Sequence, residues 1–228
     1  MGRETTPEEF AAVCLALQNM GAANINIVTG SHAIPGIVEG LTAAKKMGVH
    51  IPVLWNSSGY ESANALELLR DHIDIFLPDL KTLDSKLAAA FFNAPDYPQT
   101  AARAILKMAD MVNDKEKLIV RHLILPGYTD STRDVLRWFS VNIKHRAMLS
   151  LMTQYTPIPG RVKNAPQRYL SEDEYNVVMR YLDEFEIEDG FCQELLTGDD
   201  WLPDFRRSNP FSSALSVPVS PAIFSVCL

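Results

Sequence analysis

Short apolar segments alternate with amphipathic segments along most of this chain, and this alternation limits the folds open to it. The apolar segments predict strands at residues 24–29, 51–55, 73–77, 118–125 and 147–153. Helices are predicted at about 7–20, 34–47, 61–70, 97–112, 130–143 and 171–186. Successive strands joined by helices run parallel, because each helix returns the chain to the starting edge of the sheet. The pattern predicts an α/β fold, either an open doubly wound sheet or a barrel of fewer than eight strands.

Two predicted helices begin with the same signature, a hydroxyl residue followed three positions later by glutamate. Thr6 and Glu9 stand at the start of the first helix, and Ser171 and Glu174 stand at the start of the last. In such a pair the hydroxyl accepts a backbone N–H and the glutamate side chain accepts another. We therefore predict a capping box at each of these two helix starts.

Composition and charge exclude several classes of protein. The chain has 228 residues, 47% of them apolar, and a net charge of −7. No apolar run approaches the roughly 20 residues of a membrane span, the first residues lack a signal pattern, and non-specific nucleic-acid binding needs a basic surface. We expect a cytoplasmic protein with no nucleic-acid or membrane partner. Residues 1–200 are predicted to form one domain, and residues 201–228 a C-terminal extension with an irregular tail.

Polar residues lie at or near the end of every predicted strand. In both candidate architectures the carboxyl ends of the strands meet at one edge, where ligands bind. The candidate binding residues at these ends are Thr29, His32, Asn56, Ser58, Asp79, Lys81, Arg121 and Gln154. Five polar strand ends together are harder to explain by chance than any one of them. We predict that these residues converge on one ligand-binding rim.

Simpler explanations exist for several of these candidates. Asp79 and Lys81 are two positions apart, share a face of extended backbone and can simply pair with each other. The segment that begins at Asn56 is rich in residues that favour turns, and His32 can cap the helix that follows it. Arg121 lies in an apolar strand, and a buried charge without a partner is costly. An acidic partner or an anionic ligand is therefore expected beside Arg121.

Several common catalytic and metal-binding motifs are absent from the sequence. It has no Gly-x-Gly-x-x-Gly, P-loop, Gly-x-Ser-x-Gly or His-Glu-x-x-His pattern. Its three cysteines, Cys14, Cys192 and Cys227, are far apart and predict neither a disulfide framework nor a metal site. The side chains alone give little basis for catalysis, and this favours the use of a cofactor.

Four segments carry a family resemblance when they are taken together, at residues 21–29, 56–61, 74–81 and 201–205. They resemble the radical S-adenosylmethionine (radical SAM) superfamily, in particular proteins similar to pyruvate formate-lyase activating enzyme, over roughly residues 5–215. The resemblance implies a partial parallel (β/α) barrel with S-adenosylmethionine and a 4Fe-4S cluster as cofactors. It implies reductive cleavage of S-adenosylmethionine at the cluster, followed by hydrogen abstraction from a glycyl-radical type protein or a small molecule.

The resemblance also implies a place for each candidate residue. Thr29 and His32 would meet the methionine end of S-adenosylmethionine, Gln154 would lie near the adenosyl end, and Arg121 would face the carboxylate or the ribose. The candidates at the second and third strand ends would also approach the cofactor, namely Asn56, Ser58, Asp79 and Lys81.

The sequence departs from the family at the iron–sulfur cluster. The family holds the cluster through a Cys-x-x-x-Cys-x-x-Cys loop after its first strand, and this chain has no such motif. Thiolate ligands are what hold a cluster of this kind. The first strand and the cluster loop are therefore expected to be missing, as in an N-terminally truncated family member. We expect no metal site in this chain and no activity from it alone.

Two alternative functions stay open at this point. A lysine at a strand end suits Schiff-base chemistry, so Lys81 could serve a cluster-independent, aldolase-like α/β lyase. The other alternative is a non-catalytic remnant that binds only a nucleotide or a partner.

Overall fold

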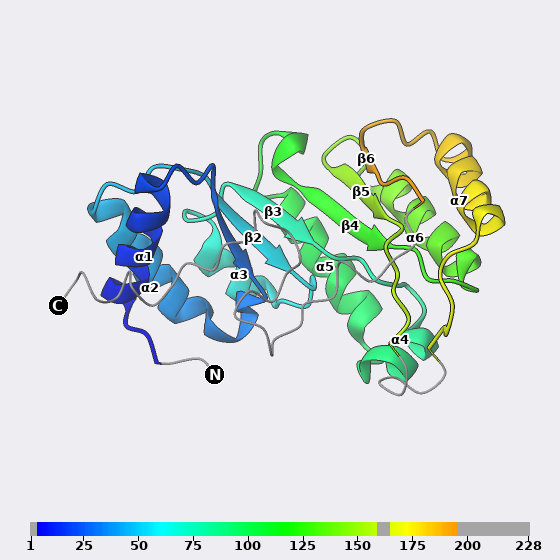
Figure 1. The fold of residues 1–228 in the computed structure, drawn as a ribbon, viewed down its shortest axis with the longest axis horizontal. Coiled ribbons are helices and arrows are strands. Elements are labelled where there is room, and N and C mark those ends of the chain that lie inside the picture. The colour runs from blue at the N-terminus through cyan, green and yellow to red at the C-terminus, as the bar shows by residue number, and fades with distance from the viewer. Residues whose placement is uncertain (1–3, 159–164, 196–228) are drawn as a thin grey trace.

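The computed structural model describes residues 4–158 and 165–195, and these contain six parallel strands and seven α-helices (Figure 1). The strands are β1 (Ile25–Val28), β2 (Val53–Ser57), β3 (Ile75–Pro78), β4 (Ile119–Leu123), β5 (Met148–Met152) and β6 (Gly190–Cys192). The helices are α1 (Pro7–Asn19), α2 (Ile34–Lys46), α3 (Ala63–Leu69), α4 (Ser85–Phe92), α5 (Tyr97–Ala109), α6 (Thr129–Asn142) and α7 (Glu172–Glu184). The predicted α/β class is confirmed.

The strands lie in sequence order, with β1-β2-β3 in one sheet and β4-β5-β6 in the other. Every strand pair is parallel. Two isolated parallel bridges join β3 to β4, between Phe76 and Leu118 and between Asp79 and Arg121. The described strands thus form a partial parallel barrel whose carboxyl ends share one edge, as predicted (Figure 1).

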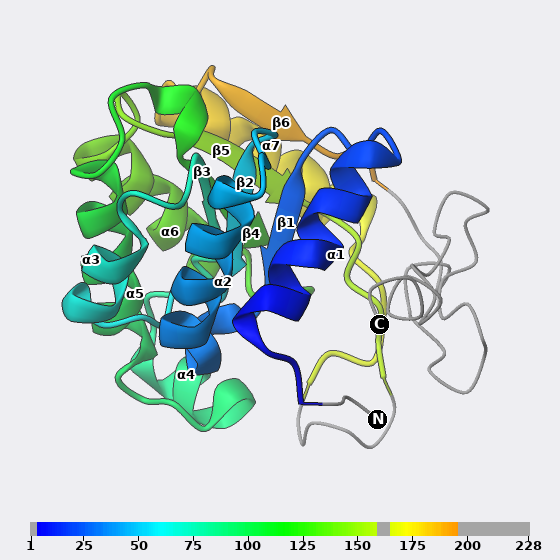
Figure 2. The same cartoon turned by 90° about the vertical axis from the view of Figure 1, so that its left-hand side faces the viewer.

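Alternate residues of β2, β3, β4 and β5 are buried, because helices cover one face of the sheets. In β2, Val53, Trp55 and Ser57 are buried, whereas Leu54 and Asn56 between them are half-buried. Figure 2 shows α2, α3 and α5 on the same side of β2 and β3. Within the described residues, the face of the sheets away from these helices is the less buried one.

The predicted strands and helices are all present, and the structure adds one α-helix, one strand and two short 3₁₀ helices at Gly30–Ala33 and Lys115–Lys117. Helix α4 begins after Asp84, whose side chain accepts hydrogen bonds from the backbone N–H groups of Lys86 and Leu87. Strand β6 has three residues, all exposed, so it carries no apolar pattern to detect. The predicted boundary at residue 200 lies outside the described residues. Among the described helices, none is long and apolar enough to cross a membrane.

Both predicted capping boxes are confirmed. In α1 the backbone N–H of Glu9 donates to Thr6 Oγ1 at 3.2 Å, and Glu9 Oε2 accepts from the Thr6 N–H at 3.0 Å. In α7 the backbone N–H of Glu174 donates to Ser171 Oγ at 3.3 Å, and Glu174 Oε2 accepts from the Ser171 N–H at 3.0 Å. These bonds satisfy N–H groups that a helix start leaves without partners.

Glu174 also ties helix α7 to the loop after β4. Its carboxylate accepts from Arg168 Nη1 and Nη2 at 2.6 and 2.7 Å, and from the Gly127 N–H at 2.6 Å. The hydrogen bond from Arg168 is the largest of the causes that lower the pKa of Glu174 to about 2, and the other bonds add to it.

We expect Glu174→Gln to destabilise the protein by about 1 kcal/mol in urea unfolding, since the half-exposed Arg168 limits the loss.

The matched control is Glu172→Gln, which neutralises an exposed carboxylate in the first turn of the same helix. It retains the capping box and the contacts of Glu174, so a change of at most about 0.5 kcal/mol is expected. Equal destabilisation by the two variants would show that the bonds of Glu174 do not stabilise α7.

Candidate cofactor site at the carboxyl ends of the strands

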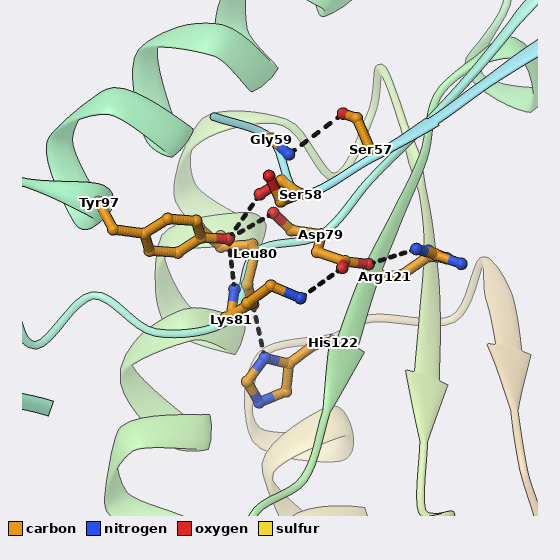
Figure 3. Close-up of polar contacts among 9 residues, drawn as sticks. All are labelled: Ser57, Ser58, Gly59, Asp79, Leu80, Lys81, Tyr97, Arg121 and His122. Carbon is orange, nitrogen blue, oxygen red and sulfur yellow. Dashed lines mark hydrogen bonds and ion pairs between the residues drawn. The ribbon is translucent and has the colours of Figure 1, made fainter. Parts of the chain in front are cut away.

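Three charged candidates form one cluster at the strand ends, which we call the Asp79 ion group: Asp79, Lys81 and Arg121. Asp79 Oδ2 lies 2.6 Å from Lys81 Nζ, and Asp79 Oδ1 lies 2.7 Å from Arg121 Nη2 (Figure 3). The side chains are 15%, 36% and 25% exposed in that order, so the cluster is accessible from solvent. The pairing of Asp79 with Lys81 that their spacing allowed is present, and Asp79 supplies the acidic partner that was one of the two alternatives for Arg121.

The Asp79 ion group carries one excess positive charge, because two cations share one carboxylate. The Nε atom of Arg121 is buried and has no hydrogen-bond partner among the described residues. The Asp79–Arg121 contact is short enough for an ion pair but is not aligned as a hydrogen bond, since Asp79 Oδ1 also lacks a hydrogen-bond partner in the described part. A guanidinium that is only partly satisfied, beside an excess positive charge, suits a carboxylate or another anionic acceptor.

The backbone between Asp79 and Lys81 is held from two sides. The Tyr97 hydroxyl accepts from the Lys81 N–H at 3.0 Å and lies 2.8 Å from the Asp79 carbonyl oxygen. On the opposite side the Leu80 carbonyl contacts His122 Nδ1 at 2.7 Å, and the Leu80 N–H donates to the Arg121 carbonyl at 2.9 Å (Figure 3). Tyr97 was not among the residues predicted from the sequence, because nothing in a helix start marks such a contact.

The segment after β2 is a turn, as its composition suggested. The Gly59 N–H donates to Ser57 Oγ at 3.1 Å, and Gly59 has a positive φ of +73°. The Ser58 carbonyl lies 2.9 Å from the Tyr97 hydroxyl. Asn56 is still a residue of β2, and the structure brings the loop of Ser58 that follows this strand beside the loop of Asp79 and Lys81.

The remaining candidates lie on either side of this centre. Thr29 precedes the short 3₁₀ helix that follows β1, His32 lies within it, and both side chains are exposed. The Thr29 N–H donates to the Asn56 carbonyl at 2.9 Å. Gln154, after β5, accepts a hydrogen bond from Gln193 Nε2 at 3.0 Å. These three residues share the strand-end edge with the Asp79 ion group. Within the described part of the chain, no hydrogen bond or ion pair joins their side chains to that group.

A buried carboxylate missed by the sequence analysis lies at the same edge. Glu61 is 4% exposed, and its Oε1 accepts from Ser31 Oγ at 2.6 Å. Its Oε2 has no hydrogen-bond partner among the described residues. The bond to Ser31 connects the 3₁₀ helix after β1 to the loop after β2.

The described cysteines do not fit an iron–sulfur cluster. Cys14 lies in α1, is 2% exposed, and burial raises the pKa of its thiol to about 11. Cys192 is exposed in β6, and Cys227 lies outside the described residues. Within the described part no three His, Cys, Asp or Glu side chains are grouped so that they could hold a metal ion. A cluster needs several thiolates at one point, so no reaction step is assigned to one here.

The parallel strands in sequence order define a partial (β/α) barrel, and solved structures share this fold. The chain is similar to a domain of pyruvate-formate lyase-activating enzyme from Bacteroides vulgatus, with a TM-score of 0.54 and 13% identity over 75% of this chain and 98% of that one. It is also similar to Streptococcus suis SuiB bound to S-adenosylmethionine, with a TM-score of 0.60 and 15% identity over 85% of this chain and 45% of SuiB. SuiB bound to its precursor peptide SuiA gives a TM-score of 0.59, at 14% identity over 85% of this chain and 44% of that one.

Sequence comparison adds one curated relative. The chain is 27% identical over 152 residues to the uncharacterized protein MJ0674 of Methanocaldococcus jannaschii. The matched region is 66% of this chain and 43% of the relative, so the chain spans less than half of that protein's length. No family model matches the chain.

Proposed function

We propose that this chain binds S-adenosylmethionine at the carboxyl ends of its strands, as the cofactor-binding part of a radical SAM protein similar to pyruvate formate-lyase activating enzyme. The main observation behind this proposal is the Asp79 ion group, which has an excess positive charge and an unsatisfied Arg121 Nε. It lies at the edge where such folds bind ligands. The similar fold of SuiB, solved with S-adenosylmethionine bound, supports the same ligand.

Each candidate residue has a proposed role in holding the ligand. Arg121 and Lys81 attract the carboxylate of the methionine part, and Asp79 holds the two cations in place. The neutral polar candidates at the edge donate to and accept from the ligand, namely Thr29, His32, Asn56, Ser58 and Gln154. In radical SAM proteins a 4Fe-4S cluster supplies the electron that cleaves the sulfonium. The proposal for this chain is limited to binding, because its described residues do not fit the cluster.

Isothermal titration calorimetry with two ligands tests this assignment. Methylthioadenosine keeps the adenosyl part of S-adenosylmethionine and lacks the aminocarboxylate. Wild-type protein is expected to bind S-adenosylmethionine about tenfold more tightly than methylthioadenosine. Arg121→Gln should weaken binding of S-adenosylmethionine about tenfold and leave that of methylthioadenosine nearly unchanged.

The matched control is Lys46→Met, which removes an exposed positive charge in the last turn of α2. Lys46 is outside the Asp79 ion group, and both affinities should stay within about twofold of wild type. Absence of any heat on titrating the wild-type protein with S-adenosylmethionine would rule out the proposed function. Equal losses for both ligands in Arg121→Gln would remove Arg121 from the carboxylate contact.

The aldolase-like alternative fits the geometry less well. A Schiff base forms from a free amine, and Lys81 Nζ is paired with Asp79 Oδ2 at 2.6 Å. Borohydride trapping of a carbonyl substrate on the wild-type chain, lost in Lys81→Ala, would favour the lyase. The non-catalytic alternative predicts no turnover, and it is compatible with the binding proposed here.

A polypeptide is the proposed partner class for the whole protein. The similar fold of SuiB was solved with the precursor peptide SuiA bound. A protein substrate of the glycyl-radical type, or a small molecule, is compatible with a site that opens at the edge of the strands. Placement in the cytoplasm stays a prediction from the sequence.

A further inference from the structure

We propose that Tyr97 is a positioning residue of the candidate site, because its hydroxyl joins the two strand ends that carry Ser58, Asp79 and Lys81. This inference rests on the proposed binding function and names a residue through which that site is built. Tyr97 is the first residue of α5, lies outside the sheets and is only 3% exposed.

The hydroxyl of Tyr97 meets three backbone groups from two loops. Its oxygen lies 2.9 Å from the Ser58 carbonyl and 2.8 Å from the Asp79 carbonyl, and it accepts from the Lys81 N–H at 3.0 Å (Figure 3). A phenol has one hydrogen to donate, so the two carbonyls share it, while the oxygen accepts from Lys81. Burial raises the pKa of Tyr97, so the hydroxyl stays protonated and remains a donor.

The ring of Tyr97 is held by neighbouring aromatic side chains. It stacks on Tyr60, with ring centroids 5.8 Å apart and planes at 23°, and its centroid lies 5.7 Å from that of Phe92. Contacts of this kind fix the orientation of an aromatic ring. The hydroxyl is therefore presented at one point, where the loops after β2 and β3 meet.

The variant Tyr97→Phe tests the role of the hydroxyl separately from the packing of the ring. Tyr97→Phe keeps the ring and its stacking, but the Lys81 N–H loses its acceptor and the carbonyls of Ser58 and Asp79 lose their shared donor. The loops are then free to shift relative to each other, and the Asp79 ion group shifts with them. We expect binding of S-adenosylmethionine to weaken about tenfold at a temperature at which the variant is fully folded.

Two control variants distinguish this role from a loss of stability. Tyr175→Phe also removes a tyrosine hydroxyl, one on helix α7 and outside the loops after β2 and β3. Ile105→Val removes one methylene from a fully buried residue of the same helix as Tyr97. Both controls are expected to bind S-adenosylmethionine within about twofold of wild type. An affinity loss in either that equals the loss in Tyr97→Phe would overturn the proposal.

A second measurement does not depend on S-adenosylmethionine. Lysines are dimethylated with ¹³C-formaldehyde and cyanoborohydride as the hydride donor, and the Lys81 and Lys46 signals are identified by their loss in Lys81→Arg and Lys46→Arg. Tyr97→Phe is expected to shift the Lys81 signal and to leave the Lys46 signal in place. An unchanged Lys81 signal would overturn the positioning role. If the wild-type protein binds no S-adenosylmethionine, the proposed function fails, and the Lys81 signal still decides the role of Tyr97.

Discussion

Replacing Gly59 by alanine is expected to destabilise the protein by about 3 kcal/mol and to weaken binding of S-adenosylmethionine at least about tenfold. Gly59 has a φ of +73°, which an alanine adopts only with strain. A Cβ atom at this position would lie 2.6 Å from the carbonyl oxygen of Asp79. This neighbour is a backbone atom and cannot rotate away, so the loops after β2 and β3 must move apart.

Two other glycines separate the causes of this loss. Gly48 has a φ of +94° but no atom within 4 Å of an added Cβ, so Gly48→Ala measures the backbone strain alone, about 1 kcal/mol. Gly36 lies in α2 with open space around it, and Gly36→Ala is expected to stabilise the helix by up to about 1 kcal/mol. Urea unfolding and calorimetry on the three variants give both quantities. A loss in Gly59→Ala no larger than in Gly48→Ala would show that the close approach to Asp79 does not matter.

The Asp79 ion group was largely predictable from the sequence. The spacing of two residues placed Asp79 and Lys81 on one face of extended backbone, and Arg121 required an acidic partner because it lies in an apolar strand. The identity of that partner was not predictable, because an open sheet and a barrel order the strands differently. The structure places β3 beside β4, and this brings Arg121 to Asp79.

Tyr97 and Glu61 were not predictable in the same way. Tyr97 contacts Ser58, which is 39 positions away, through a backbone carbonyl. Backbone acceptors are the same for every residue type, so no sequence pattern marks such a partner. Glu61 is an acidic residue just after a turn, where exposure is the usual outcome, yet it is 4% exposed. Contacts between loops that follow different strands depend on the packed fold, and the alternation of strands and helices does not encode them locally.

The fold and the site support different parts of the family resemblance. The fold is similar to that of a domain of an activating enzyme and to that of SuiB, at identities of 13% to 15%. A fold shared at that level does not define chemistry. The residues decide the rest: the Asp79 ion group fits an anionic ligand, while the described cysteines lie apart on α1 and β6. Binding and cluster chemistry are therefore separate questions for this chain.

Lowering the pH from 6.5 to 4 is expected to reduce the free energy of unfolding by about 3 kcal/mol through His122 alone. His122 is 2% exposed, and burial, the largest cause, lowers the pKa of its imidazole from 6.5 to about 4. Its Nδ1–H donates to the Leu80 carbonyl at 2.7 Å, and Nε2 accepts from Thr132 Oγ1 at 3.0 Å. The folded protein thus holds the neutral ring, while the unfolded chain takes up a proton below pH 6.5. The stability is complete above pH 6.5 and falls by about 1.4 kcal/mol per pH unit down to about pH 4.

Urea unfolding between pH 4.5 and 6.5 avoids the carboxylates of Glu67 and Glu174, whose pKa values are lowered to about 2 and whose stabilising effect is lost mainly below that window. Burial also lowers the pKa of His72, so the effect of His122 is the difference between the wild type and a variant that keeps His72. His122→Gln removes the titration and keeps a donor and an acceptor, so its unfolding free energy should fall less steeply than that of the wild type. His32→Gln, at an exposed position, should keep the wild-type slope. Protonating His122 keeps the Nδ1–H donor to the Leu80 carbonyl and turns Nε2 from an acceptor into a donor toward Thr132 Oγ1. Parallel slopes in the wild type and His122→Gln would show that the folded protein accepts the proton at His122 as readily as the unfolded chain does.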